Sequence, residues 1–362
     1  MLLSEEQRAS VWLSCAEISP KRVEEFKEKY HSLSSLWEIF GSSSAPSFSP
    51  AAEAVLKKLH SNSAMEQVIN RLEQCHVHLL FREDDSYPEQ LRQIDQSPYL
   101  LYYAGSLACL KQPAVAIVGS RNPSSYGIEI AGVLAKDLCK AGVCVISGLA
   151  RGIDAAAHRA AVACDGETIG VLGSGINVPY PQEHIPLLRK IAGGRGLILS
   201  EYPLDASPAA YHFPHRNRII SGLSQGVVFV EGKIRSGGMN TVSCALNQGR
   251  EVFAVPGRVG TECAEGPLTI LREGARLVTC ADDILEDLGL KSVSVMKDTK
   301  KAVFTPIQQS IVNALKNGPI SVDELENKTG IDTNAVLTEL TIMEIDGLIV
   351  RENGNQYRLP ID

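Results

Sequence analysis

Three turns rich in glycine and serine contain the residues best suited to chemistry in this sequence. Each turn follows a short apolar run, carries a basic side chain and precedes an amphipathic stretch. When such a turn joins a parallel strand to a helix, unpaired N–H groups at the start of the helix attract anions, and a nearby arginine can donate two hydrogen bonds to one phosphate. The turns therefore predict a phosphate-binding site made of Gly119, Ser120 and Arg121, of Ser147, Gly148 and Arg151, and of Lys233, Ser236, Gly237 and Gly238.

The segment from 213 to 218 adds one aromatic residue followed by two arginines. The bases of a single nucleic-acid strand are unpaired, and each can stack on an aromatic ring that has cations beside it. Phe213, Arg216 and Arg218 therefore predict contact with a single strand, with an ordinary core phenylalanine as the alternative for Phe213. Asp154 and His158, after the second turn, fit a helix cap and a hydrogen-bonded histidine better than catalytic groups.

Motifs of common enzyme classes are broken or missing. Gly173–Gly175 follows an apolar run, but Val178 stands where a dinucleotide-binding fingerprint needs its third glycine. The serine of Gly222–Gly226 has the spacing of a nucleophile elbow but precedes a strand, and no Gly-Lys-Ser/Thr phosphate loop occurs. We expect no catalytic residue, no cofactor and no metal site.

One enzyme hypothesis stays open as the alternative. Pro256–Glu262 resembles the Pro-Gly-Gly-x-Gly-Thr-x-x-Glu signature of the lysine-decarboxylase-like phosphoribohydrolases, which cleave nucleoside monophosphates. Arg258 replaces the second glycine, and the glutamate aligns only to within one residue. Such a hydrolase would use the same phosphate site, with Glu201, Glu262 or Glu265 as its acid or base.

The turns are positioned by apolar runs that alternate with amphipathic stretches from about residue 74 to 290. This alternation is typical of parallel strands joined by crossover helices, and continuous apolar runs indicate strands that are buried on both faces. We predict an α/β fold with a doubly wound, mostly parallel Rossmann-like sheet. Its strands are expected at 114–118, 143–147, 168–172, 197–200, 227–230 and 252–255, and its helices at 127–141, 152–163, 182–192, 214–224, 239–248 and 267–274.

Other segments flank this core. Short helices in residues 1–72 predict an N-terminal helical (SAM-like) domain, and residues 73–290 form the Rossmann-like domain that would bind DNA. Residues 291–304 are polar and lysine-containing, which predicts a linker. Residues 305–362 predict a C-terminal winged-helix domain, with helices at 306–316, 321–328 and 332–346 followed by a hairpin.

Charge and hydropathy limit the partners. The net charge of −7 disfavours a long duplex footprint, because duplex binding depends on many basic contacts to phosphate. Residues 303–362 hold four basic against nine acidic residues, so we expect this tail to contact protein rather than DNA. No apolar run approaches the roughly 20 residues of a membrane-spanning helix, and the start lacks the features of a secretory signal. We expect a cytoplasmic protein with reduced cysteines and no membrane partner.

The strings around the turns resemble the DprA/Smf family in their order and spacing. They are Ala116–Arg121, Ser147–Asp154, Val171–Gly175, Ser200–Pro203, Phe213–Ile220 and Val255–Gly257. The resemblance implies a single-stranded-DNA-binding protein of natural transformation, which protects incoming DNA, helps to load the RecA recombinase and forms a homodimer. It also implies that Gly119, Ser120, Arg121 and Phe213 line the DNA site. The chain departs from the family pattern at Gly238, Leu268 and Ala210, which leaves the strength of binding open.

Overall fold

A computed structural model describes residues 2–290, 304–316, 318–352 and 355–360 of the chain. It divides into two compact units, Met1–Val293 and Ser294–Asp362. Each is described here by itself. The predicted linker, 291–304, lies almost wholly outside the described residues.

The first unit begins with five helices: α1 Glu5–Cys15, α2 Pro20–Tyr30, α3 Leu33–Ile39, α4 Pro50–Leu59 and α5 Asn62–Gln74. A serine side chain caps the N-terminus of each one, which explains why a serine-rich sequence forms helices here. Trp12 is fully buried among them and donates from Nε1 to the carbonyl of Leu56 at 3.0 Å. The same core continues into the sheet, where the Ser14 and Tyr102 hydroxyls lie 3.0 Å apart. The domain boundary at 72 stays a prediction.

A nine-stranded sheet forms the centre of this unit, in the order β1-β2-β6-β5-β4-β3-β7-β8-β9. Strands β3 to β9 pair in parallel, whereas β1 and β2 pair antiparallel with each other and β2 with β6. The prediction of a doubly wound, mostly parallel sheet is confirmed. The strands are β1 His78–Phe81, β2 Leu100–Gly105, β3 Ala114–Val118, β4 Cys144–Ser147, β5 Thr168–Leu172, β6 Leu197–Ser200, β7 Gly226–Phe229, β8 Glu251–Ala254 and β9 Arg276–Leu277.

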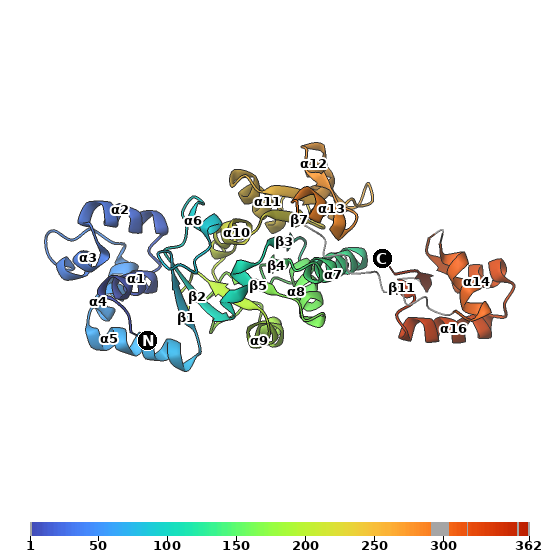
Figure 1. The fold of residues 1–362 in the computed structure, drawn as a ribbon, viewed down its shortest axis with the longest axis horizontal. Helices are drawn as coiled ribbons and strands as arrows, with labels where there is room; N and C mark the ends of the chain where they lie inside the picture. The colour runs from blue at the N-terminus through green and yellow to red at the C-terminus, as the bar shows by residue number, and fades with distance from the viewer. Residues whose placement is uncertain (1, 291–303, 317, 353–354, 361–362) are drawn as a thin grey trace. The chain divides into compact units, whose positions relative to one another are not determined.

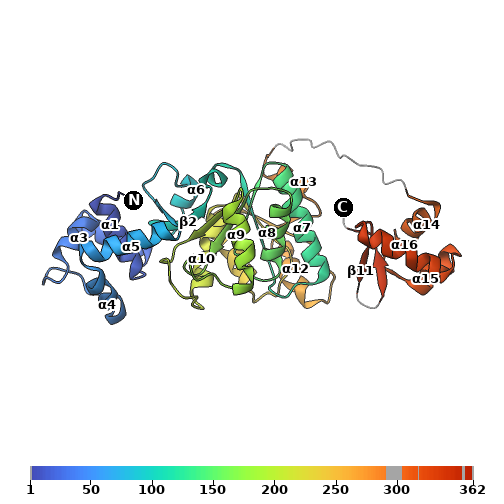
Figure 2. The ribbon, with the colours of Figure 1, turned by 90° about the horizontal axis from the view of Figure 1, so that it is seen from below.

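Helices cover both faces of the sheet (Figures 1 and 2). Helices α7, α8 and α9 pack on one face, and α10, α11 and α12 pack on the other. The helices of this part are α6 Glu89–Arg92, α7 Ser125–Lys140, α8 Ile153–Ala163, α9 Ile185–Gly193, α10 His212–Gly222, α11 Gly237–Asn247, α12 Glu265–Arg272 and α13 Ala281–Asp287. The helix expected at 182–192 instead begins with a 3₁₀ turn, Gln182–His184, before α9.

The six strands expected from the sequence are all present, whereas β1, β2 and β9 were missed. Strand β9 has two residues, which is too short for a periodic pattern. The antiparallel edge formed by β1 and β2 was not predicted from the sequence and is seen in the structure.

The second unit has the elements of a winged helix. They are α14 Pro306–Leu315, β10 Ile320–Ser321, α15 Val322–Thr329, α16 Thr333–Ile345, β11 Val350–Glu352 and β12 Gln356–Arg358, and the strands pair in the order β10-β12-β11. Its own core includes Ile311, Leu325 and Leu340, all fully buried. The turn of the predicted hairpin, at residues 353–355, lies mostly outside the described residues. Across the described ranges, no helix is both long and apolar enough to cross a membrane.

Candidate nucleic-acid interface

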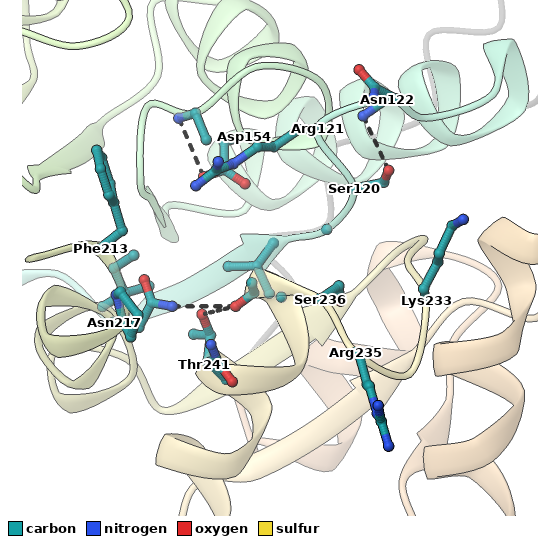
Figure 3. Close-up of a pocket in the computed structure, with 18 of the residues that line it drawn as sticks. Ser120, Arg121, Asn122, Asp154, Phe213, Asn217, Lys233, Arg235, Ser236 and Thr241 are labelled. Carbon is teal, nitrogen blue, oxygen red and sulfur yellow. Dashed lines mark hydrogen bonds between the residues drawn. The ribbon is translucent and has the colours of Figure 1, made fainter. Parts of the chain in front are cut away.

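The order of the strands creates a crevice beside β3. The chain passes from β3 through β4 and β5 to β6 on one side and then returns to β7 on the other side of β3. The loops after β3 and β7 therefore diverge, and this is the point where open α/β sheets bind ligands. A cavity of about 630 Å³ lies there, lined by Gly119–Asn122 from the first loop and by Lys233 and Arg235–Gly238 from the second (Figure 3).

Internal carboxylates accept hydrogen bonds from several of the backbone donors of the first two turns. Glu231, which is buried, accepts from the N–H of Ser124 at 2.8 Å and from its hydroxyl at 2.5 Å, at the N-terminus of α7. Asp154 accepts from the N–H groups of Gly148 and Ala150 at 3.1 and 3.4 Å. Burial raises the pKa of Asp154, while the nearby Arg216 opposes that shift. The anions that these turns attract are thus side chains of the protein itself.

The third turn is open. Ser236 caps α11 by accepting from the N–H of Met239, and Gly237 and Gly238 are the first two residues of the helix. No acceptor within the described residues hydrogen-bonds to the N–H of Gly237 or Gly238. The N-terminus of α11 therefore points two unpaired donors and the positive end of its dipole at the cavity.

The side chains around the cavity combine cations with an aromatic ring. The Arg121 guanidinium lies 5.6 Å from the centre of the Phe213 ring, and both line the cavity. Lys233 and Arg235 leave the loop after β7 in different directions (Figure 3). Lys233 is paired with Glu262, and Arg151 forms a two-point pair with Glu183 at 2.8 Å.

Two of the predicted phosphate ligands are instead held inside the protein. Arg216 is 4% exposed and donates to the carbonyls of Gly148, at 2.9 Å, and Val171. Burial lowers its pKa to about 10, so the guanidinium stays charged near neutral pH and adds positive potential below the cavity floor. Arg218 is 8% exposed and pairs with Glu201 at 2.7 Å.

Comparison with known proteins identifies the family. The family model of DNA recombination-mediator protein A matches residues 78–289, more than half of the chain, and that of the DprA winged helix domain matches residues 297–355. The chain belongs to the DprA family. This confirms the resemblance drawn from the strings around the turns.

DprA relatives match over most of the chain. Protein Smf of Escherichia coli is 39% identical over 303 residues, which cover 82% of this chain and 81% of that protein. DNA processing protein DprA of Bacillus subtilis is 43% identical over 208 residues, or 57% of this chain and 70% of that protein. The family role in DNA processing therefore applies to this chain.

Solved DprA structures share the fold. DprA from Streptococcus pneumoniae superposes with a TM-score of 0.66 at 33% identity, covering 79% of this chain and 99% of that one. DprA from Helicobacter pylori, described in a study of its single-stranded DNA binding mode, gives 0.53 at 29% identity and covers 59% of this chain and 95% of that one.

Most residues predicted from the sequence converge on this DprA cavity. The main cavity is lined by Gly119, Ser120, Arg121, Phe213, Arg216, Lys233, Ser236, Gly237 and Gly238. An adjoining cavity of about 150 Å³ includes Gly148 and Arg151 as well as Arg121 and Phe213. Ser147 lies elsewhere, because it is fully buried and donates to the carbonyl of Ile117 at 2.6 Å.

Close packing explains the first glycine of the DprA pattern. A Cβ at Gly119 would lie 2.8 Å from the carbonyl oxygen of Glu231 and 2.7 Å from the Ile153 side chain. The turn after β3 can approach the turn after β7 only without that side chain. Gly119 therefore shapes the crevice.

Tyr180 and Asn217 were missed as site residues. The Tyr180 ring lies 5.6 Å from that of Phe213 and is 45% exposed, so it widens the aromatic surface of both cavities. Asn217 donates to the carbonyl of Gly237 at 3.2 Å and ties α10 to the open turn. The position of Tyr180 after the third parallel strand, at the same edge as the other turns, was the available signal.

The glutamates of the hydrolase alternative do not share one site. Glu262 lines the main cavity, where it pairs with Lys233, whereas Glu201 lies behind α10 and pairs with Arg218. In the described ranges, no cluster of three or more histidine, cysteine, aspartate or glutamate side chains is arranged to hold a metal ion.

Proposed function

We propose that this DprA-family chain binds single-stranded DNA in the crevice between the loops after β3 and β7. The observation that carries the proposal is the open N-terminus of α11 facing Arg121 and Phe213 across one cavity. Two backbone donors and a guanidinium suit a phosphate, and a half-buried ring that lines the cavity suits an unpaired base. The similarity to DprA from Helicobacter pylori, whose single-stranded DNA binding mode has been described, supports the same ligand.

The charge distribution supports a short single strand over a long duplex. Residues 73–290 hold 19 basic against 23 acidic residues, so attraction to phosphate comes from the cluster at the cavity and not from the whole surface. We expect each subunit to hold a few nucleotides and to act as a binding protein without catalysis.

Labelled single- and double-stranded oligonucleotides, titrated across salt concentrations, test this function. We expect the single strand to bind more tightly than the duplex. The slope of log affinity against log salt concentration should correspond to contacts with a few phosphates. Arg121→Ala should weaken the binding and lower the slope by about 0.7, the contribution of one phosphate on a single strand. Equal affinity of Arg121→Ala and the unaltered chain, or release of free base from nucleoside monophosphates, would contradict the proposal.

We further propose that the chain acts in the cytoplasm during natural transformation, protects incoming DNA and helps to load RecA as a homodimer. Exposed apolar side chains support self-association: Leu277, on the edge strand β9, is 54% exposed, and Leu246, near the end of α11, is 60% exposed. A second copy would cover this edge. It would also add a second DNA site, so that one longer strand could be held at both sites with higher overall affinity. Sedimentation tests the dimer, and RecA strand exchange on coated DNA tests the loading.

A further inference from the structure

A second large cavity lies on the other side of the start of α10. It has a volume of about 720 Å³ and is bounded by the α1–α2 loop, the start of α4, the loop after β6 and the N-terminal residues of α10. The two cavities adjoin, because Ala210 lines the first and the next residue, Tyr211, lines the second. Likewise, Phe213 lines the first and His215 lines the second.

A buried carboxylate oxygen in this cavity lacks a donor. Glu201 follows β6, and its side chain is 9% exposed. Its Oε1 accepts from Arg218 at 2.7 Å, whereas its Oε2 has no hydrogen-bond partner among the described residues. Nδ1 of His215 lies 3.4 Å from Oε2 without hydrogen-bond geometry. A buried acceptor without a partner is costly, and a ligand that donates to it would remove that cost.

The walls favour a flat ligand that carries donors. Tyr99, Tyr202 and Tyr211 contribute aromatic rings, and Tyr211 is 68% exposed at the rim. The charged residues in this lining are two acids, Glu17 and Glu201, without a lysine or arginine. The lining therefore offers a phosphate no lysine or arginine, so we expect a nucleic-acid strand to enter with a base first.

We propose that this cavity receives an unpaired guanine base from the strand held in the first cavity. The proposal rests on the proposed function, since the neighbouring phosphates stay at the open turn of α11. Guanine presents its N1–H and its exocyclic amino group side by side, and both can donate to a carboxylate. Thymine presents one N–H between two carbonyl oxygens, which a carboxylate repels. Adenine and cytosine each place an acceptor nitrogen beside their amino group.

The test compares an all-thymidine strand with strands that carry one guanosine at successive positions, by fluorescence anisotropy at fixed salt. We expect guanosine at one position to raise the affinity about tenfold, as one charge-assisted hydrogen bond would. Glu201→Gln should abolish this increase, because its amide would meet the base donors with a donor of its own. The affinity for the all-thymidine strand should stay unchanged.

Glu201 also neutralises the buried Arg218, so Glu201→Gln could disturb the fold as well as the contact with the base. Variants at other residues separate these two effects. Tyr211→Ala and Glu17→Gln alter the rim and should also reduce the guanosine increase. Arg121→Ala, the control in the first cavity, should weaken both strands equally and preserve their ratio. The inference is overturned if no guanosine position raises the affinity, or if the increase survives both Glu201→Gln and Tyr211→Ala. Failure to bind the all-thymidine strand would instead overturn the proposed function.

Discussion

The guanidinium carbon of Arg121 lies 5.6 Å from the centre of the Phe213 ring, although 92 positions separate the two residues in the sequence. Arg121 comes from the loop after β3, and Phe213 from the first turn of α10. A cation at this distance is attracted by the ring, so the pair holds one group for phosphate beside one group for a base.

Loss of the Phe213 ring should weaken binding without changing its dependence on salt. We expect Phe213→Ala to cost about 1–3 kcal/mol of single-strand affinity, the usual contribution of one stacked base. Phe213→Leu keeps the apolar bulk but loses the ring and should be nearly as weak. Anisotropy titrations at several salt concentrations measure both quantities. Wild-type affinity in both variants would indicate that Phe213 is an ordinary core residue.

The open turn can be tested at one backbone N–H. Gly237 is the first residue of α11, where proline is tolerated, and Ser236 has φ −134° and ψ 164°, which suit a residue before proline. Gly237→Pro should keep the fold but lower single-strand affinity, because it removes a donor to phosphate. The matched control is Gly237→Ala, whose added Cβ meets nothing within 4 Å and which keeps the donor. Equal affinities for the two variants would argue against phosphate at this turn.

Two glutamates pair with basic residues that we propose as DNA ligands. Glu262 holds Lys233 and Glu183 holds Arg151, all at exposed positions. Glu262→Gln and Glu183→Gln should therefore tighten single-strand binding and steepen its salt dependence, by about 0.7 for each phosphate gained. Glu89→Gln is the control, because it breaks a similar exposed pair, with Arg92, away from the cavity. An equal gain in the control would point to net charge alone.

Removal of residues 294–362 should leave single-strand affinity unchanged. The tail is acidic, and α16 carries Glu339 and Glu344 without a lysine or arginine where a DNA-reading helix would present basic groups. The same helix exposes Ile342 and Ile345, which suits contact with protein. Anisotropy with single and double strands compares the two chain lengths. A drop in duplex affinity after truncation would show that the tail contacts DNA.

His158 should make the fold sensitive to acid. It is fully buried, with Nδ1 2.8 Å from the Thr168 hydroxyl, and burial lowers its pKa to about 3 from its usual value of 6.5. Below pH 6.5 the unfolded chain takes up a proton that the folded protein refuses. The free energy of unfolding should thus fall by about 1.4 kcal/mol per pH unit through this residue. Urea unfolding at pH 7 and pH 5 measures the effect. In His158→Asn the free energy of unfolding should depend less on pH.

The sequence by itself determined six of the nine strands of the large sheet, their parallel arrangement and the family. Continuous apolar runs identify strands that are buried on both faces, and turns after parallel strands must meet at one sheet edge. That reasoning brings Gly119, Arg121 and Gly237 into one crevice without a structure. It also explains why β9 escaped notice, since a strand of two residues has no period to detect.

Only the tertiary structure decided which groups at that edge are free to bind. Glu231 reaches the N-terminus of α7 from 107 positions away and Asp154 holds the second turn, whereas no carboxylate of the described residues reaches the N–H groups of Gly237 and Gly238. Arg216 and Arg218 look like phosphate ligands in the sequence but are buried. The physical reason is that spacing along the chain places a donor at an edge, whereas its partner comes from packing between distant segments.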